Sequence, residues 1–383
     1  MSYRKIKRGG GMFGRRKNYT WLKILCGVLC VAVLFYGGYY LGSALFGEES
    51  ESSSLSEQSS NTHVEGSSLP DADPPVTEKS RLILHFCDAQ TLLNADARSA
   101  FFQKAKEAGA TGIVFPCKDE SGNVYLKLTG EVLERSKAVV SSALDPAALS
   151  KELTDAGLVG IPMVYTFKDP LAASKNPSLA IWYNNGIENY LWLDGYADKG
   201  GKPWLNPYKE ATVSYLLSIN QALYDAGFDQ IILNGNLFGT TADNTSASFG
   251  QVSSSHLDAM TAFVQKCESQ AAAADAVCWF AADAGELFDK NKNMNASFLQ
   301  TKAKHIAPVF NLTTLPHNLT FGEKSVASAV EDPTGATKLL LDAYASKSPD
   351  TAFLSIFADY QTVSKVQAES LEEDAPYLLL QAG

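Results

Sequence analysis

Residues 161–170 read Ile-Pro-Met-Val-Tyr-Thr-Phe-Lys-Asp-Pro, an apolar run that stops at a lysine and an acid. A run this short and this apolar predicts a strand that is buried on both faces, as in a parallel sheet. Two other stretches have the same form: residues 113–119 end in Lys-Asp, and residues 231–236 end in Asn-Gly-Asn. The third run therefore carries amides where the other two carry a carboxylate.

Apolar runs of this kind alternate with amphipathic stretches over residues 81–383. Strands are predicted over Leu82–Phe86, Gly112–Phe115, Ile161–Phe167, Ile231–Leu233, Val277–Phe280, Ile306–Phe310 and Phe353–Phe357. Helices are predicted over Arg98–Ala108, Pro207–Ala226, His256–Ala274 and Pro333–Ala345. Strands separated by helices favour parallel βαβ units with right-handed crossovers. The segment is long enough for a single α/β domain, a (β/α)8 barrel of the TIM type.

The number of barrel strands is left open by the sequence. Seven strands are clear, so the barrel is either irregular or completed by a strand with a weak pattern. That strand is either Ala138–Ala143 or a piece near the C-terminus. An open Rossmann-type sheet is the alternative fold, but no Gly-x-Gly-x-x-Gly motif follows a strand, so its usual ligand is not indicated.

The first 80 residues are predicted to lie outside this domain. Ile24–Phe46 is a stretch of 23 residues without a charge, long enough to span a bilayer as one transmembrane helix. Residues 1–23 hold eight basic residues and no acid, whereas three glutamates follow the stretch between Glu48 and Glu51. Because positive segments stay in the cytoplasm, we expect a single-pass protein of the cell membrane with a cytoplasmic tail and an extracytoplasmic C-terminal domain.

The remaining N-terminal features concern partners. Residues 47–80 are rich in serine and acids, which predicts a disordered linker. Gly38 and Gly42 form a Gly-x-x-x-Gly step that would let two membrane helices approach as a homodimer. Beyond residue 23 the chain has 24 basic against 42 acidic residues, which argues against a nucleic-acid partner.

The cysteines indicate neither a metal nor a cofactor. Two of the six lie in the predicted membrane segment, and no Cys-x-x-Cys spacing occurs, so a zinc site has no support and no cofactor is predicted. Cys87 and Cys117 lie near the ends of predicted strands. They either pair outside the cell or remain buried thiols.

Residues just after the strands of a parallel barrel gather at one end, where the active sites of this fold lie. In this chain they form an acid-rich rim that consists of Asp88, Lys118, Asp119, Lys168, Asp169, Asn234, Asn236, Asp283, Glu286, Asn311 and Asp359. The rim either serves a function or is polar because strand ends meet solvent.

The insertion between Asp169 and Pro207 is far longer than a βα loop of roughly 2 to 6 residues, which suggests a function for it. It contains the aromatic residues Trp182, Tyr183, Tyr190, Trp192, Tyr196 and Trp204. Flat aromatic faces beside polar groups suit sugar rings. The same aromatics alternatively form a small core of the loop against the barrel.

Several motifs follow one another in the order of a known family. Residues 111–122 contain Thr-Gly-Ile-Val-Phe and Lys-Asp-Glu-Ser-Gly, residues 167–172 read Phe-Lys-Asp-Pro-Leu-Ala, residues 204–208 read Trp-Leu-Asn-Pro-Tyr, and residues 226–231 read Ala-Gly-Phe-Asp-Gln-Ile. Ala-Asp at 282–283 matches more thinly. Together they resemble the putative glycosyl hydrolase domain family of bacterial (β/α)8 envelope proteins, relatives of the α-amylase-like glycosidases. The resemblance implies an extracytoplasmic polysaccharide ligand and catalysis by carboxylates.

Two departures from the family's pattern remove acidic groups. The family usually reads Asp-Val-Lys-Asp where residues 116–119 read Pro-Cys-Lys-Asp. It usually reads Phe-Asp-Tyr-Val-Arg-Phe-Pro where residues 233–239 read Leu-Asn-Gly-Asn-Leu-Phe-Gly, so Asn234 occupies the position of an acid. A glycosidase needs two carboxyl groups beside the bond it cleaves, and an amide cannot serve as either one.

The leading hypothesis is a membrane-anchored barrel that binds envelope or extracellular polysaccharide and whose hydrolytic activity is lost or reduced. Its candidate substrate-binding residues are Lys118, Lys168, Trp192, Trp204, Asn206, Tyr208 and Asn236. One alternative is an active glycosidase that uses Asp283 with Asp119 or Asp169 as the catalytic pair. The other is a non-catalytic scaffold that binds another envelope protein.

Overall fold

A computed structural model describes residues 82–185, 187, 190–239, 246–291, 293–358 and 377–379. The predicted cytoplasmic tail, the membrane helix 24–46 with Gly38 and Gly42, and the linker 47–80 lie outside these ranges, as does Asp359. None of the helices within the described ranges has the length and apolar character needed to cross a membrane.

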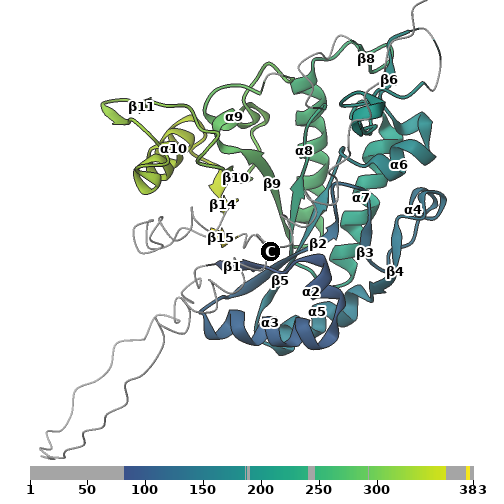
Figure 1. The fold of residues 1–383 in the computed structure, drawn as a ribbon, viewed down its shortest axis with the longest axis horizontal. Helices are drawn as coiled ribbons and strands as arrows, with labels where there is room; N and C mark the ends of the chain where they lie inside the picture. The colour runs from purple at the N-terminus through teal and green to yellow at the C-terminus, as the bar shows by residue number, and fades with distance from the viewer. Residues whose placement is uncertain are drawn as a thin grey trace, which may run out of the picture. The chain divides into compact units, whose positions relative to one another are not determined.

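Eight parallel strands form the centre of the fold (Figure 1). They are β1 (Ile83–Phe86), β2 (Gly112–Lys118), β5 (Val159–Tyr165), β7 (Gln230–Asn234), β9 (Val277–Asp283), β10 (His305–Phe310), β14 (Ser355–Phe357) and β15 (Tyr377–Leu379). Each pairs in parallel with the next one in this order, and β15 pairs with β1. The pairings return to the first strand, so the arrangement is that of a (β/α)8 barrel in the α/β class.

The seven clear strands of the sequence are all present, and the eighth position is taken by β15 near the C-terminus. The other candidate is also a strand, β4 (Val139–Leu144), but it does not belong to the ring. It pairs with β3 (Val124–Leu126), which runs antiparallel to β2. These two strands extend the sheet sideways from the barrel.

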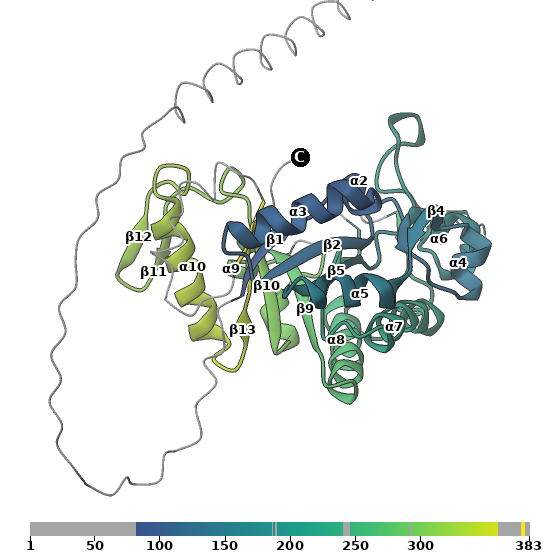
Figure 2. The same cartoon turned by 90° about the horizontal axis from the view of Figure 1, so that it is seen from below.

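Helices cover the outside of the barrel strands (Figures 1 and 2). The longer ones are α3 (Ala95–Glu107), α5 (Pro146–Asp155), α7 (Glu210–Asp225), α8 (His256–Ala273) and α10 (Pro333–Lys347). The shorter ones are α2 (Ala89–Leu93), α4 (Glu131–Ser136), α6 (Pro170–Lys175) and α9 (Ala284–Phe288). Caps fix where several of them begin. Ser255 and Asp258, for example, form a capping box at the start of α8.

The long loops carry small strands of their own. β6 (Trp182–Tyr183), in the insertion after α6, pairs antiparallel with β8 (Ala247–Ser248), in the segment after β7. β11 (Leu319–Phe321) and β12 (Lys324–Val326) form a hairpin beside α10 (Figure 2), and β13 (Ala352–Phe353) pairs with the start of β10. The β6–β8 pair joins two βα connections at the end of the molecule where α9 begins (Figure 1).

Two buried clusters lie on the two faces of the closed sheet. The cluster inside the barrel consists of Leu84, Val114, Ile161, Met163, Ile232, Trp279, Ala281, Ala307, Leu354 and Ile356. The larger cluster lies between the strands and the helices and includes Phe115, Val164 and Phe280. Neighbouring residues of a strand face opposite sides, so each strand contributes alternate residues to the two clusters.

Candidate functional site

The inward positions at the carboxyl ends of the strands hold the side chains of the barrel mouth. Extending the two-residue alternation beyond the interior cluster places Tyr165 at the end of β5, Asn234 at the end of β7 and Asp283 at the end of β9. These three strands are neighbours in the sheet. A phenol, an amide and a carboxylate therefore stand in a row at the end of the barrel where active sites of this fold lie.

Two cavities open at this end and share Tyr165, Asn234 and Val309 as lining residues. The β9 cavity, of about 300 Å³, extends from these residues to Asp283 and α9. The β2 cavity, of about 350 Å³, extends from them towards Asp119 and the ends of β1 and β2. Both volumes lie at the lower end of the range of roughly 300–1,000 Å³ for small-molecule sites.

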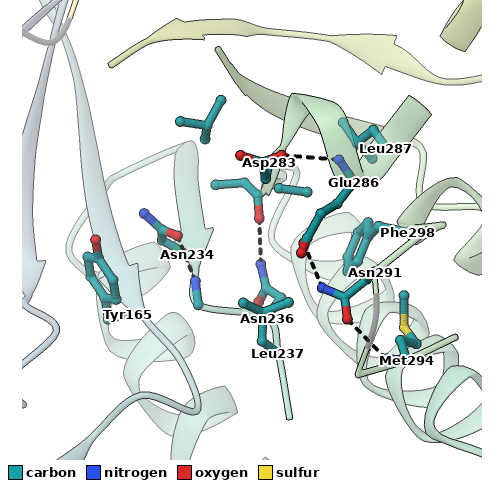
Figure 3. Close-up of a pocket in the computed structure, with 14 residues that line it drawn as sticks. Tyr165, Asn234, Asn236, Leu237, Asp283, Glu286, Leu287, Asn291, Met294 and Phe298 are labelled. Carbon is teal, nitrogen blue, oxygen red and sulfur yellow. Dashed lines mark hydrogen bonds between the residues drawn. The ribbon is translucent and has the colours of Figure 1, made fainter. Parts of the chain in front are cut away.

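The β9 cavity contains two carboxylates from one short helix (Figure 3). Asp283 caps α9, and its Oδ1 accepts a hydrogen bond from the Glu286 backbone N–H at 3.1 Å. The Glu286 Oε2 accepts a hydrogen bond from the Asn291 side chain at 2.6 Å, and the Asn291 Oδ1 accepts one from the Met294 backbone at 3.0 Å. Asp283 is exposed and Glu286 is half-buried, so both acids are open to a bound molecule.

The side-chain amides of Asn234 and Asn236 make different contacts (Figure 3). The Asn234 Oδ1 accepts a hydrogen bond from the Gly235 N–H at 2.7 Å, and its Nδ2 lies 3.9 Å from the Met163 sulfur. Asn236 is 2% exposed, donates to the backbone oxygens of Leu233 and Ala281, and accepts from the Thr166 hydroxyl. Asn236 therefore links three strand ends, whereas Asn234 presents an amide to both cavities.

Asp119 stands in the β2 cavity with all of its acceptor positions in use. The loop after β2 donates to its Oδ1 from the backbone of Ser121 and Asn123, at 2.9 and 2.8 Å. Its Oδ2 accepts from the Asn123 amide at 3.0 Å and from the Tyr125 hydroxyl at 2.7 Å. Burial, together with this carboxylate, raises the pKa of Tyr125 to about 12, so the phenol stays a donor. The Asp119 carboxylate is thus held in place by the loop that follows β2.

Tyr165, between the two cavities, is also a neutral phenol. Burial is the main cause that raises the pKa of Tyr165, and the negative charges of Glu120 and Asp119 raise it further. Lys168, a candidate sugar contact, pairs with Glu120 at the rim, with 2.6 Å between Nζ and Oε2 and side chains that are 30% and 58% exposed. An exposed pair of this kind contributes little stability, which leaves Lys168 free to exchange its partner for a ligand.

Asp169 and Lys118 form an ion pair in which both side chains are completely buried, with 2.7 Å between Nζ and Oδ2. The Tyr215 hydroxyl donates to the same carboxylate oxygen at 3.0 Å, and the Ala172 backbone N–H donates to the other at 2.9 Å. Lys118 borders the β2 cavity, but its ammonium group is directed to Asp169. A substrate cannot reach such a carboxylate, so the structure gives Asp169 a structural role instead of the predicted catalytic one.

The predicted stacking residues Trp192 and Trp204 are buried, at 1% and 2% exposure. The Trp192 indole donates to the Ser246 hydroxyl at 3.2 Å, and the Trp204 indole donates to the Asp194 carboxylate at 3.0 Å. The alternative interpretation of the insertion, a small core of its own, therefore describes these two residues. Neither of them lines a cavity at the barrel mouth.

Asn206 and Tyr208 also hold the insertion together. Asn206 is 1% exposed, donates to the Phe249 backbone oxygen at 3.2 Å and accepts from the Tyr208 N–H at 3.0 Å. The Tyr208 hydroxyl donates to the Ser254 backbone oxygen at 3.0 Å. The exposed aromatics of the insertion are instead Tyr183, Tyr190 and Tyr196, at 41%, 55% and 74%.

Of the predicted site residues, Asp283, Asn234, Asn236, Asp119 and Lys118 line the two cavities. Sequence reasoning missed Tyr165, Tyr125 and Asn291. A signal for Tyr165 was present, because it continues the spacing of Ile161 and Met163. None pointed to Asn291, which reaches Glu286 through a turn outside the regular elements.

The structure gives no indication of a metal centre in the part of the chain that it describes, where three or more His, Cys, Asp or Glu side chains never gather closely enough to hold an ion. Cys87 and Cys117 are both buried free thiols, the second of the two alternatives for this pair. Burial raises the pKa of each to about 12. Neither thiol is therefore a nucleophile near neutral pH.

Comparison with known proteins gives a family match over more than half of the chain. The model of a family described as putative glycosyl hydrolase domain matches residues 86–296. No curated protein matches the sequence.

Solved structures with a similar fold include three bacterial proteins. The glycoside hydrolase domain of PgaB (BpsB) from Bordetella bronchiseptica is 12% identical, over 78% of this chain and 93% of that one, with a TM-score of 0.49. A β-N-acetylhexosaminidase from Bacteroides fragilis is 9% identical, over 79% and 60%, with a TM-score of 0.46. A hypothetical protein from Ruminiclostridium thermocellum is 23% identical, over 48% and 91%, with a TM-score of 0.42.

Proposed function

The chain belongs to the putative glycosyl hydrolase domain family, and from this premise we propose that its barrel binds polysaccharide with lost or reduced hydrolysis. The observation that carries the proposal is Asn234. It lines both cavities at the barrel mouth, beside Tyr165 on one side and the strand of Asp283 on the other. An amide at this central position can bind a hydroxyl group but can neither attack an anomeric carbon nor deliver a proton.

The lining of the mouth suits a saccharide. The Tyr165 ring offers a flat apolar face, and Asp283, Glu286 and the Asn234 amide offer acceptors and donors for sugar hydroxyls. Two adjoining cavities of about 300 and 350 Å³ accommodate neighbouring units of one chain. The rim carries more acid than base, which favours a neutral or cationic glycan over a polyanionic one.

The proposed setting is the outer side of the cell membrane. The uncharged stretch 24–46, the basic residues before it and the serine-rich linker 47–80 support an anchored domain that stands off the bilayer. Alkali and carbonate extraction of membranes, followed by protease treatment of intact cells, tests this part. Release of the full-length chain by carbonate, or protection of its C-terminal domain from protease, would count against it.

Equilibrium binding of the full-length chain to purified envelope polysaccharide tests the main proposal. Asn234→Ala and Tyr165→Phe each remove one hydrogen-bonding group and should weaken binding by roughly 1 kcal/mol. Asp155→Asn, at an exposed position of α5 on the outside of the barrel, is the matched control and should leave binding unchanged. If the parent protein and these three variants bind the glycan with equal affinity, the glycan binds elsewhere on the protein.

A second function, true hydrolysis, is favoured by one observation. Asp283 and Glu286 line the same cavity, and the amide of Asn291 holds Glu286 in place. Asp283 and Glu286 are therefore the candidate catalytic pair of an active enzyme. They take the place of the predicted pair, which combined Asp283 with either Asp119 or Asp169. Release of reducing ends that is lost in Glu286→Gln but kept in Asp119→Asn would establish this pair, whereas no release from the parent protein would leave binding alone.

A further inference from the structure

We infer that Asn234-Gly235 is a self-modification site at which the Asn234 amide is converted into an aspartate within the cavity. The inference rests on the proposed function for its meaning, because it would supply the carboxylate that the barrel mouth lacks between Tyr165 and Asp283. The modification itself depends only on the geometry of the two residues.

The first step of deamidation is the attack of the following backbone nitrogen on the side-chain carbonyl carbon. The Gly235 N–H donates a hydrogen bond to the Asn234 Oδ1 at 2.7 Å, so the side chain is folded back beside this nitrogen. Holding the amide group next to the nitrogen lowers the entropic cost of bringing the nitrogen to Cγ. The Asn234 Nδ2, which must leave, lies 3.9 Å from the thioether sulfur of Met163.

The fold also requires the glycine that permits this attack. Gly235 has a φ of 72°, a conformation that residues with a side chain rarely adopt. A Cβ at this position would lie 3.4 Å from the Tyr165 ring. Any larger residue would be strained here, so the same turn that brings Asn234 to the mouth keeps an unshielded nitrogen beside its amide.

The chemistry needs no reagent other than water. Hydroxide from water takes the proton of the Gly235 nitrogen, and the nitrogen forms a bond to the Asn234 Cγ. The bond from Cγ to Nδ2 then breaks, and Nδ2 takes a proton from water and leaves as ammonia, which regenerates the hydroxide. Water then adds to the resulting cyclic imide and opens it. Opening at the bond between Cγ and the Gly235 nitrogen restores the normal backbone and leaves an aspartate side chain, and the open cavity admits the water.

A second Asn-Gly step in the same chain provides an internal reference. Asn185-Gly186 lies in the long insertion, where Asn185 is exposed. Its Oδ1 accepts a hydrogen bond from the Ile187 backbone at 3.0 Å, which directs the amide to a different nitrogen. The two steps have the same residues and differ in their surroundings, so their relative rates report what the fold contributes.

The experiment is peptide mapping by mass spectrometry of the full-length chain after incubation in mildly alkaline buffer prepared with heavy-oxygen water. Parallel samples are folded or unfolded in urea. We expect the ratio of conversion at Asn234 to conversion at Asn185 to be at least as high in the folded protein as in urea, with aspartate as a product at residue 234. An intact Asn234 in folded protein whose Asn185 has converted would overturn the inference, and so would isoaspartate as the sole product.

A second measurement separates this inference from the proposed function. Asn234→Asp carries the product from the start, and Asn234→Gln keeps an amide that cannot cyclise in the same way. If aged parent protein and Asn234→Asp release reducing ends from envelope polysaccharide and Asn234→Gln does not, the modification and a hydrolytic role for the new aspartate are both supported. Conversion without any release leaves the modification in place and counts against a hydrolytic role for residue 234.

Discussion

Asp169 and Asp283 occupy the same local position in two regions of the barrel and have opposite surroundings. Asp169 follows β5 and Asp283 ends β9. Each caps the short helix that begins there and accepts a hydrogen bond from the backbone N–H three residues on, at 2.9 and 3.1 Å. Asp169 is buried and contacts Lys118 and Tyr215, whereas Asp283 is exposed in the β9 cavity. A strand followed by Asp and a helix therefore identifies a cap, and only the packing around it decides whether the acid can meet a ligand.

The largest effect is expected from Asp169→Asn. Asparagine keeps the cap, but the substitution leaves the Lys118 ammonium buried without its partner, which should lower the free energy of unfolding by about 3–5 kcal/mol. Urea unfolding followed by circular dichroism measures this loss. The double variant Lys118→Met/Asp169→Leu removes both charges and should recover most of it. A single variant as stable as the parent would contradict a buried ion pair.

Trp204→Ala is expected to have the next largest effect and extends the comparison to the insertion. Trp204 is 2% exposed, so its removal should cost about 3 kcal/mol or more of unfolding free energy through the cavity it leaves. Tyr196→Ala removes an aromatic side chain that is 74% exposed and should change the unfolding free energy by less than about 0.5 kcal/mol. If the two variants unfold at the same urea concentration, Trp204 is not part of a core.

A smaller effect on the free energy of unfolding is expected from pH, through two half-buried histidines of the barrel strands, His305 and His85. Burial, with a contribution from Lys304, lowers the pKa of His305, and burial also lowers the pKa of His85. The unfolded chain therefore takes up protons that the folded chain excludes, so stability is highest above pH 6.5, the ordinary pKa, and falls as the pH drops below it.

Thermal unfolding on both sides of pH 6.5 measures this dependence. His305→Phe keeps a ring against Trp279, which His305 contacts edge to face at 5.1 Å between ring centroids, and should reduce the decrease at low pH. An unchanged pH profile in this variant would assign the dependence to other groups.

The smallest effect on stability is expected from Asp283→Asn, which makes the same change of residue type as Asp169→Asn. Asparagine is as good a cap as aspartate, and no buried charge loses its partner, so the unfolding free energy should change by less than about 0.5 kcal/mol. Glycan binding should weaken all the same, because a charged acceptor in the β9 cavity is lost. A large loss of stability in Asp283→Asn would remove the contrast with Asp169.

The sequence predicted the barrel well because its main signal is local. Runs such as Ile161–Phe167 are buried on both faces and contain few polar residues, so their type and order can be read without knowledge of their neighbours. The eighth strand could not be chosen between Ala138–Ala143 and the C-terminal piece, because strand pairing is a property of distant segments. Both candidates are strands, and only β15 lies between β14 and β1.

The site was predicted only in part, because burial depends on contacts between distant segments. Asp283 and Asn234 follow from their positions after strands. The burial of Asp169 depends on Lys118 from another strand and Tyr215 from α7, and the burial of Trp192 depends on packing against Gly239, beyond the next strand. Polar residues after strands are therefore good predictors of position and poor predictors of exposure.

The pairing of β15 with β1 has a consequence for the order in which the protein is made. The first barrel strand emerges from the ribosome long before its second neighbour, so one edge of β1 and one edge of β14 stay unpaired until translation of the ring is nearly finished. Exposed strand edges readily pair with other chains, and contacts between distant segments form slowly. Nascent chains interrupted before Tyr377 would therefore be the species that aggregate during synthesis, and a chaperone that covers these two edges would act at that stage.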